Sequence, residues 1–142
     1  MGVELINRQE FELARTQLGT NFVRILGYFR EDGAKSVALV EEAMRQRNSA
    51  ALVVPAHTLK GESRQFGSLA LGDLAERIEM SARHCVEQRI EPEEILSDVA
   101  GLRECFNATL KMLEEESGSP LLASRQAARK APAASLNGFT RS

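Results

Sequence analysis

The sequence predicts an all-α protein: an antiparallel up-down four-helix bundle with a short extra N-terminal helix and a disordered C-terminal tail. Two observations lead to this fold. Apolar residues recur at steps of three and four, the spacing of one helical face, and no stretch alternates polar and apolar residues long enough for a sheet. Glycine and proline are sparse before Ser117, so the loops should be short and neighbouring helices antiparallel.

The first two helices are expected near the N-terminus. A short leading helix should run from about Arg8 to Leu18, and a longer apolar stripe follows from Phe22 to Met44. Thr20 and Asn21 are candidate caps for that stripe because either side chain can accept a hydrogen bond from a free backbone N–H group. Gly33 lies in the middle of the stripe, which therefore predicts either one long kinked helix or two shorter ones.

The third helix should run from about Ser49 to Phe66. Asn48 or Ser49 is its candidate cap, and Gly67 is its left-handed stop. A start three residues later would place Pro55 in the first turn, where the missing N–H group of proline costs no helical hydrogen bond.

Ser68 is the candidate cap of the fourth helix. The apolar residues of this helix are spaced as on one helical face: Leu71, Leu74, Ile78, Ala82 and Cys85. The segment 91–94, Glu-Pro-Glu-Glu, predicts the start of the last helix, because proline suits the first turn and acidic residues suit the positive end of the helix dipole. The last helix should end near Glu116.

The chain divides into a bundle at residues 1–116 and a tail at residues 117–142. The tail holds four basic residues and no acidic one, so its charge is +4 against −2 for the whole chain. It is rich in Ala and Ser, contains two of the four prolines, and has too few apolar residues for a core of its own. This composition is typical of a disordered segment.

Composition excludes several classes of function. A net charge of −2 argues against a nucleic-acid-binding protein, and with 5% aromatic residues and no Trp the chain lacks base-stacking platforms. The longest apolar run, residues 50–56, is far shorter than the ~20 residues that a membrane span needs. No signal peptide is apparent, and Cys85, Cys105 and His84 lack the spacing of a zinc site. We expect a cytoplasmic protein with no bound metal, no nucleic-acid partner and no membrane contact.

The third helix has two distinct faces at 100° per residue. One face points to the core and comprises Leu52, Ala56, Leu59, Ser63 and Phe66. The neighbouring face should be wet and comprises His57, Lys60, Gly61 and Arg64. Val53 and Val54 lie one turn before the histidine, where exposed apolar side chains indicate a docking surface. The pattern therefore predicts a solvent-reachable imidazole on an interaction surface.

A neutral imidazole is a good nucleophile, and no Ser, Cys or carboxylate stands in an obvious triad relation to His57. Lys60 lies one turn away, where its positive charge suits an anionic group such as a phosphoryl group arriving on the ring. Gly61 leaves a gap in the same face at a cost of about 1 kcal/mol relative to alanine in mid-helix. Arg64 could add longer-range attraction.

The run His57-Thr58-Leu59-Lys60-Gly61, followed by Gly67 and by a helix that contains Leu71, Leu74, Ala75, Ile78 and Glu79, resembles the histidine-containing phosphotransfer (HPt) domain. The resemblance implies that His57 is phosphorylated, that Lys60 stabilises the phosphoryl group and that Gly61 keeps access open. It also implies a hydrogen bond between the imidazole and Glu79, which would fix the tautomer and leave the other nitrogen free. From the residues alone, Glu79 could instead pair with Arg83 at i,i+4.

The resemblance further implies the partners: response-regulator receiver domains and hybrid histidine kinases, between whose aspartates His57 would relay a phosphoryl group. Val53, Val54, Arg64 and Arg83 are the expected partner-binding residues. No Gly-rich phosphate loop is present, so we expect a monomeric phosphocarrier without kinase activity and without a cofactor, the Mg²⁺ belonging to the receiver. Two alternatives stay open: a non-catalytic helical adaptor that binds or sequesters a receiver domain, and the phosphotransfer module of a chemotaxis-type kinase.

Overall fold

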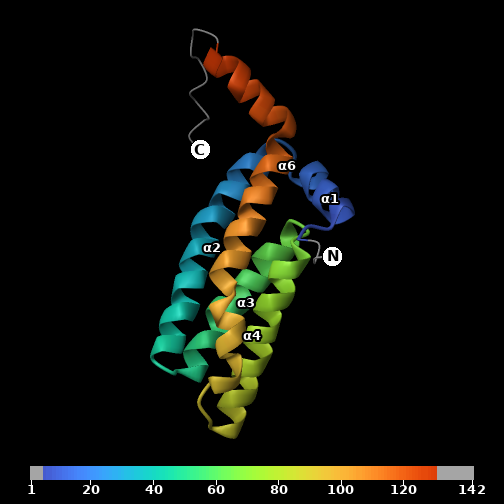
Figure 1. The fold of residues 1–142 in the computed structure, drawn as a ribbon. Helices are drawn as coiled ribbons and strands as arrows, with labels where there is room; N and C mark the ends of the chain where they lie inside the picture. Colours follow the sequence, from blue (N-terminus) through green and yellow to red (C-terminus); the bar gives the residue numbers. More distant parts are fainter. Residues whose placement is uncertain (1–4, 131–142) are drawn as a thin grey trace.

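The computed structural model describes the backbone of residues 5–130 and the side chains of residues 5–117. Its elements are α1 (Arg8–Leu18), η1 (Gly19–Asn21), α2 (Phe22–Arg45), α3 (Ser49–Gln65), α4 (Leu69–Gln88), η2 (Glu93–Ile95), α5 (Leu96–Ala100) and α6 (Leu102–Lys130). Figure 1 shows α2, α3, α4 and α6 side by side, with α1 beside one end. The predicted all-α antiparallel bundle with its short leading helix is confirmed.

The apolar stripe around Gly33 forms one helix and not two, because α2 is uninterrupted over Phe22–Arg45. Gly33 is buried, and a Cβ atom at this position would lie 2.5 Å from Cε1 of Phe106 on α6. The missing side chain therefore serves close packing between α2 and α6 rather than a break in the helix.

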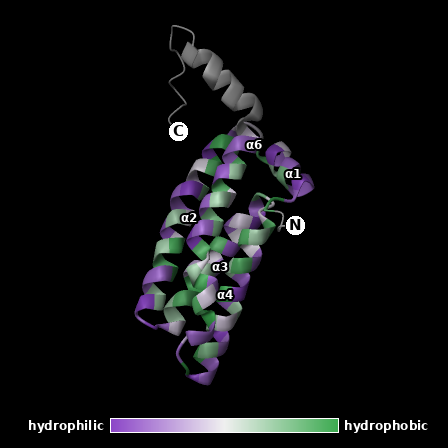
Figure 2. Cartoon of the chain, in the orientation of Figure 1, coloured by the Kyte–Doolittle hydropathy of each residue, from purple (hydrophilic) through white to green (hydrophobic). Residues whose placement is uncertain are grey.

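A chain of phenylalanine rings runs through the core and joins α1, α2, the end of α3 and α6. Phe11 meets Phe22, Phe22 and Phe29 both meet Phe66, and Phe29 meets Phe106, with ring centroids 5.5–5.7 Å apart. Such pairs contribute about 0.5–1.5 kcal/mol each beyond their buried area. Figure 2 shows hydrophobic and hydrophilic stretches alternating along the long helices, as expected of helices that pack by one face.

The turn between α3 and α4 is tight and receives the N-terminal segment. Gly67 has a φ of +74°, which confirms it as the left-handed stop of α3. Its carbonyl accepts a hydrogen bond of 2.7 Å from the backbone N–H of Asn7. A Cβ atom on Gly67 would lie 2.9 Å from the backbone nitrogen of Phe11, so both backbone conformation and space require glycine here.

The predicted caps are only partly confirmed. Asn48 caps α3 by accepting a hydrogen bond of 3.0 Å from the N–H of Ala51. Asn21 precedes α2 but makes no capping bond, because its backbone is already helical where a cap needs an extended conformation. Ser68 also forms no side-chain cap, and its buried hydroxyl has no partner. Since α3 begins at Ser49, Pro55 lies inside the helix and not in its first turn.

The prediction for the last helix is wrong in two respects. The helical stretch is interrupted at Gly101, whose N–H group closes α5 on the carbonyls of Ser97 and Asp98 at 3.3 and 3.2 Å. Helix α6 then continues to Lys130 instead of ending near Glu116, although Gly118 and Pro120 lie within it. The residues that follow, 121–130, are mostly Leu, Ala, Arg and Lys, which have favourable helix propensities. The rest of the predicted disordered tail, residues 131–142, lies outside the described residues.

Candidate functional site

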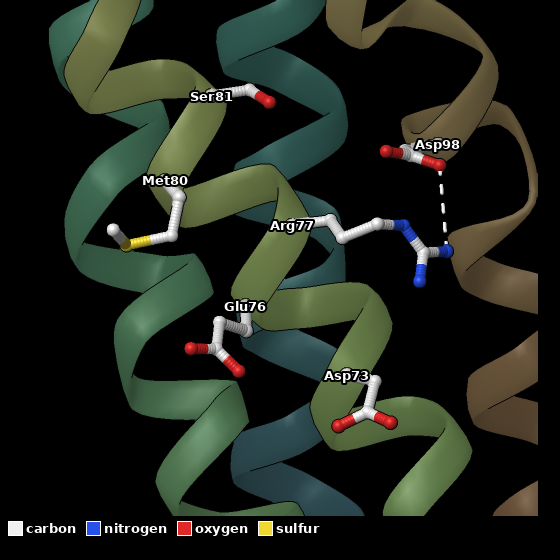
Figure 3. A pocket seen from close by; sticks show the side chains of 6 residues that line it. All are labelled: Asp73, Glu76, Arg77, Met80, Ser81 and Asp98. Atoms are coloured by element: carbon white, nitrogen blue, oxygen red, sulfur yellow. Dashed lines mark ion pairs between the residues drawn. The ribbon is translucent and has the colours of Figure 1, made fainter.

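A surface pocket lies beside α4 and is lined mainly by charged and polar side chains. It is lined by Asp73, Glu76, Arg77, Met80, Ser81 and Asp98 (Figure 3). Arg77 reaches across it to Asp98 of α5 with an N–O distance of 3.6 Å. Among the residues whose side chains are described, no three His, Cys, Asp or Glu residues gather to hold a metal ion. The residues for which the sequence predicts chemistry, His57, Lys60 and Gly61, lie instead on α3.

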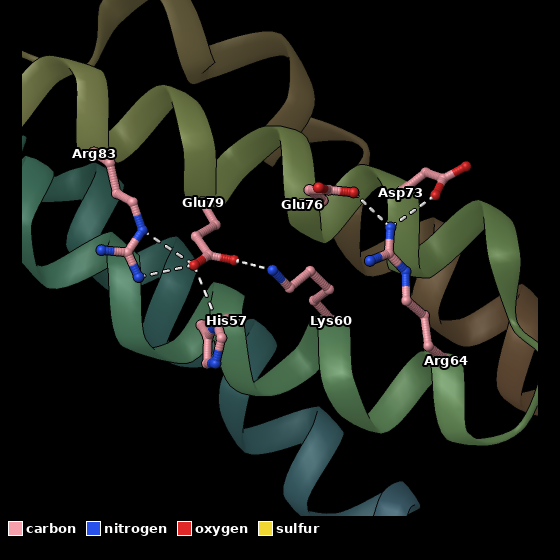
Figure 4. A network of polar contacts seen from close by, with 7 residues as sticks. All are labelled: His57, Lys60, Arg64, Asp73, Glu76, Glu79 and Arg83. Atoms are coloured by element: carbon pink, nitrogen blue, oxygen red, sulfur yellow. Dashed lines mark hydrogen bonds and ion pairs between the residues drawn. The ribbon is translucent and has the colours of Figure 1, made fainter.

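The faces of α3 are largely as its sequence predicts. Leu52, Ala56, Leu59, Ser63 and Phe66 are all buried. The side chain of His57 is 60% exposed, which confirms a solvent-reachable imidazole. Its ring is fixed on one edge, because Nδ1 lies 3.0 Å from Oε2 of Glu79 on α4. The other ring nitrogen, Nε2, points away from that carboxylate (Figure 4).

Glu79 is the centre of a polar network that links α3 to α4 (Figure 4). Its side chain is only 3% exposed, yet it contacts three donors. Lys60 places its ammonium group 2.8 Å from Oε1, and His57 lies on Oε2. Arg83 donates to the same Oε2 from Nη2 at 2.9 Å and from Nε at 3.1 Å. The sequence left open whether Glu79 contacts His57 or pairs with Arg83. Both contacts are present in the structure.

The charge of Glu79 follows from these contacts. Burial acts to raise the pKa of its carboxyl, but the ion pair with Lys60 and the hydrogen bonds from Arg83 and His57 outweigh it and lower that pKa to about 2. The carboxylate is therefore ionised at neutral pH and can only accept hydrogen bonds. Nδ1 of His57 must then carry the proton of this contact, so the tautomer with a free lone pair has that lone pair on Nε2.

Lys60 is more enclosed than its place on a wet face predicts. Its side chain is 20% exposed, because the ammonium group turns toward Glu79 rather than into solvent. A helical wheel gives the direction of a side chain around one helix but not the distance to the next helix. The expectation of a wet Lys60 is therefore wrong, while its position one turn from His57 is as predicted.

The surface around His57 contains an open gap and an exposed apolar side chain. A Cβ atom on Gly61 would meet nothing within 4 Å, so an incoming group has free space there. Val54 is 70% exposed, as a docking surface needs. Val53 is half-buried and packs against the core, so it contributes less to that surface than its spacing predicts.

Arg64 lies farther along α3 and is tied to α4. Its guanidinium group lies 3.0 Å from Asp73 and 2.5 Å from Glu76. The aliphatic part of its side chain crosses Gly72, where an added Cβ atom would lie 2.9 Å from its Cγ. These two acidic partners were not predicted from the sequence, although their spacing of three residues on α4 was an available signal. The expected role of Arg64 in partner binding stays a prediction, as does that of Arg83.

The similarity of the chain to a known protein family agrees with the geometry of the site. The family model described as "Hpt domain" matches residues 24–117, more than half of the chain. No curated protein sequence and no solved structure matches the chain. Along the described residues, no helix is long and apolar enough to cross a membrane.

Proposed function

The chain belongs to the Hpt domain family, and from that membership we propose that it relays a phosphoryl group between aspartates of receiver domains in a multistep two-component phosphorelay, with His57 as the carrier. Hpt domains are phosphocarrier modules of two-component signalling. The observation that most supports this role is the exposed imidazole of His57, whose Nδ1 is held by the buried, ionised Glu79 while Nε2 faces outward.

The proposed transfer is a displacement at phosphorus. The Nε2 lone pair attacks the phosphorus atom of a receiver aspartyl phosphate, and the N–P bond forms as the P–O bond to the aspartyl carboxylate breaks. The carboxylate leaves with the electron pair of that bond. The Nδ1 proton stays on the ring, which becomes positively charged, and the negative charge of Glu79 at 3.0 Å stabilises it.

The remaining site residues have supporting roles in this proposal. Gly61 leaves room for the receiver to approach, and Lys60 neutralises phosphoryl oxygens once they arrive. The Mg²⁺ of the reaction is assigned to the receiver domain. Both oxygens of Glu79, the carboxylate beside His57, are already occupied by cationic or N–H donors of this chain, so Glu79 is not a suitable metal ligand.

The proposed partners are response regulators and hybrid histidine kinases; receiver domains and histidine kinases are the proteins with which Hpt domains in general interact. We place the reaction in the cytoplasm, with a monomer as the acting unit. The protein would accept and donate phosphoryl groups without kinase activity of its own.

The test is to mix the protein with a phosphorylated receiver domain and assay for acid-labile, base-stable phosphate. Wild type and His84→Gln should be phosphorylated, because His84 is the other histidine of the chain and lies exposed on α4. His57→Gln should accept none while retaining its helical circular dichroism. Phosphate on His57→Gln would refute the assignment, and a wild type that binds receivers without accepting phosphate would support the adaptor alternative.

A further inference from the structure

Lys60 is not free to meet a phosphoryl group in the unphosphorylated protein. Its ammonium group lies 2.8 Å from Oε1 of Glu79 and points toward that carboxylate (Figure 4). In the proposed reaction the phosphoryl group forms on Nε2 of His57, the ring nitrogen turned away from Glu79. Lys60 therefore has to leave Glu79 before it can contact the phosphoryl oxygens.

This movement is costly unless another cation stays with Glu79. The carboxylate is almost fully buried, and a buried charge that loses its partner incurs a large desolvation penalty. The form of His57 that attacks has a lone pair on Nε2, so it supplies Glu79 with an N–H group and not with a cation. Arg83 makes both of its hydrogen bonds to Oε2, so its contacts do not depend on what happens at Oε1.

We propose that Arg83 is a positioning residue that compensates the charge of Glu79 while Lys60 moves from Oε1 to the phosphoryl group on His57. This inference rests on the proposed function. Arg83 acts through Glu79 and Lys60 and not by contacting the phosphoryl group or the partner. Its role therefore differs from the partner-binding role that its position alone predicts.

The experiment measures the rate of phosphoryl transfer from a phosphorylated receiver domain in a double-mutant cycle of Arg83→Ala and Lys60→Ala. Arg83→Ala should slow transfer roughly ten-fold, the size expected for losing one charge-assisted contact. Arg83→Lys should recover part of that rate because it keeps the charge. In the Lys60→Ala background, Arg83→Ala should slow transfer much less than it does in wild type, since no lysine remains to be released from Glu79.

Arg77→Ala is the matched control. Arg77 lies on the same helix with a similarly exposed side chain, and its ion pair is with Asp98 rather than with Glu79. It should transfer at the wild-type rate. Thermal unfolding of every variant is measured to check that it is folded at the assay temperature. If Arg83→Ala is unfolded there, Arg83→Gln takes its place.

Three results would overturn the inference. Wild-type rates for Arg83→Ala would show that Glu79 needs no second cation. Multiplicative losses in the double variant would show that Arg83 acts independently of Lys60, as a contact with the phosphoryl group or the partner. A wild-type protein that accepts no phosphate would refute the proposed function itself, and the inference with it.

Discussion

Removing the charge of Glu79 while keeping its shape tests the network that fixes His57. In Glu79→Gln the amide still fits the buried space between α3 and α4, but Lys60 and Arg83 lose the carboxylate that they share. At neutral pH the variant should be less stable than wild type. The size of this loss can be derived from the pKa of the carboxyl.

The pKa of Glu79 is lowered from an ordinary 4.5 to about 2 in the folded protein. At about 1.4 kcal/mol for each pH unit, this difference corresponds to about 3 kcal/mol of stability. Because the folded-state pKa is depressed, the contribution is fully present above pH 4.5 and is lost as the pH falls from there toward 2. Glu79→Gln should therefore be about 3 kcal/mol less stable than wild type at pH 7, and the difference should nearly vanish near pH 2.

The assay is urea unfolding followed by helical circular dichroism at a series of pH values between 7 and 2. The other carboxyl groups are the same in both proteins, so their titration cancels in the comparison. Glu76→Gln is the control: Glu76 lies on the same helix in an exposed ion pair with Arg64, which is worth about 1 kcal/mol or less. A Glu79→Gln loss that stays constant with pH, or that matches the control at pH 7, would refute the charged network.

Four further predictions follow from the structure. Gly61→Leu should slow transfer strongly without loss of helical structure, because its side chain fills open space beside His57; unchanged transfer would show that the gap is not used. Lys60→Ala should slow transfer about ten-fold, with Lys60→Arg intermediate, in rapid-quench assays. Gly33→Ala should lose about 1 kcal/mol in urea unfolding, because overpacking against Phe106 exceeds the gain in helix propensity; a more stable variant contradicts that close contact. Removing residues 118–142 should leave the transfer rate unchanged, since the matched family region ends at residue 117.

The sequence predicted features that depend on one helix at a time. The Asn48 cap, the Gly67 stop and the exposure of His57 follow from local backbone chemistry and from the angle of each residue around its own axis. The same reasoning supplied the bundle, because the apolar stripes and short loops leave few ways to pack the helices.

Features that depend on the distance between two helices were not predictable in this way. Lys60 appears wet on a helical wheel, but the depth of Glu79 on the neighbouring helix draws it inward. Arg64 faces the same side as Lys60, yet the absence of a side chain at Gly72 lets it lie across α4. The length of α6 was missed because Gly118 and Pro120, which usually end a helix, lie inside it.

The hydrogen bond from Asn7 to Gly67 has a consequence for the order of folding. Helix α1 is synthesised early, but its docking site is a turn that comes about 60 residues later in the chain, where Phe11 packs close to Gly67. Isolated helices of 11 residues are marginal in water. During synthesis α1 should therefore stay largely unstructured until α3 and the start of α4 have formed, and in the finished protein it should be among the first segments to open and exchange its amide hydrogens.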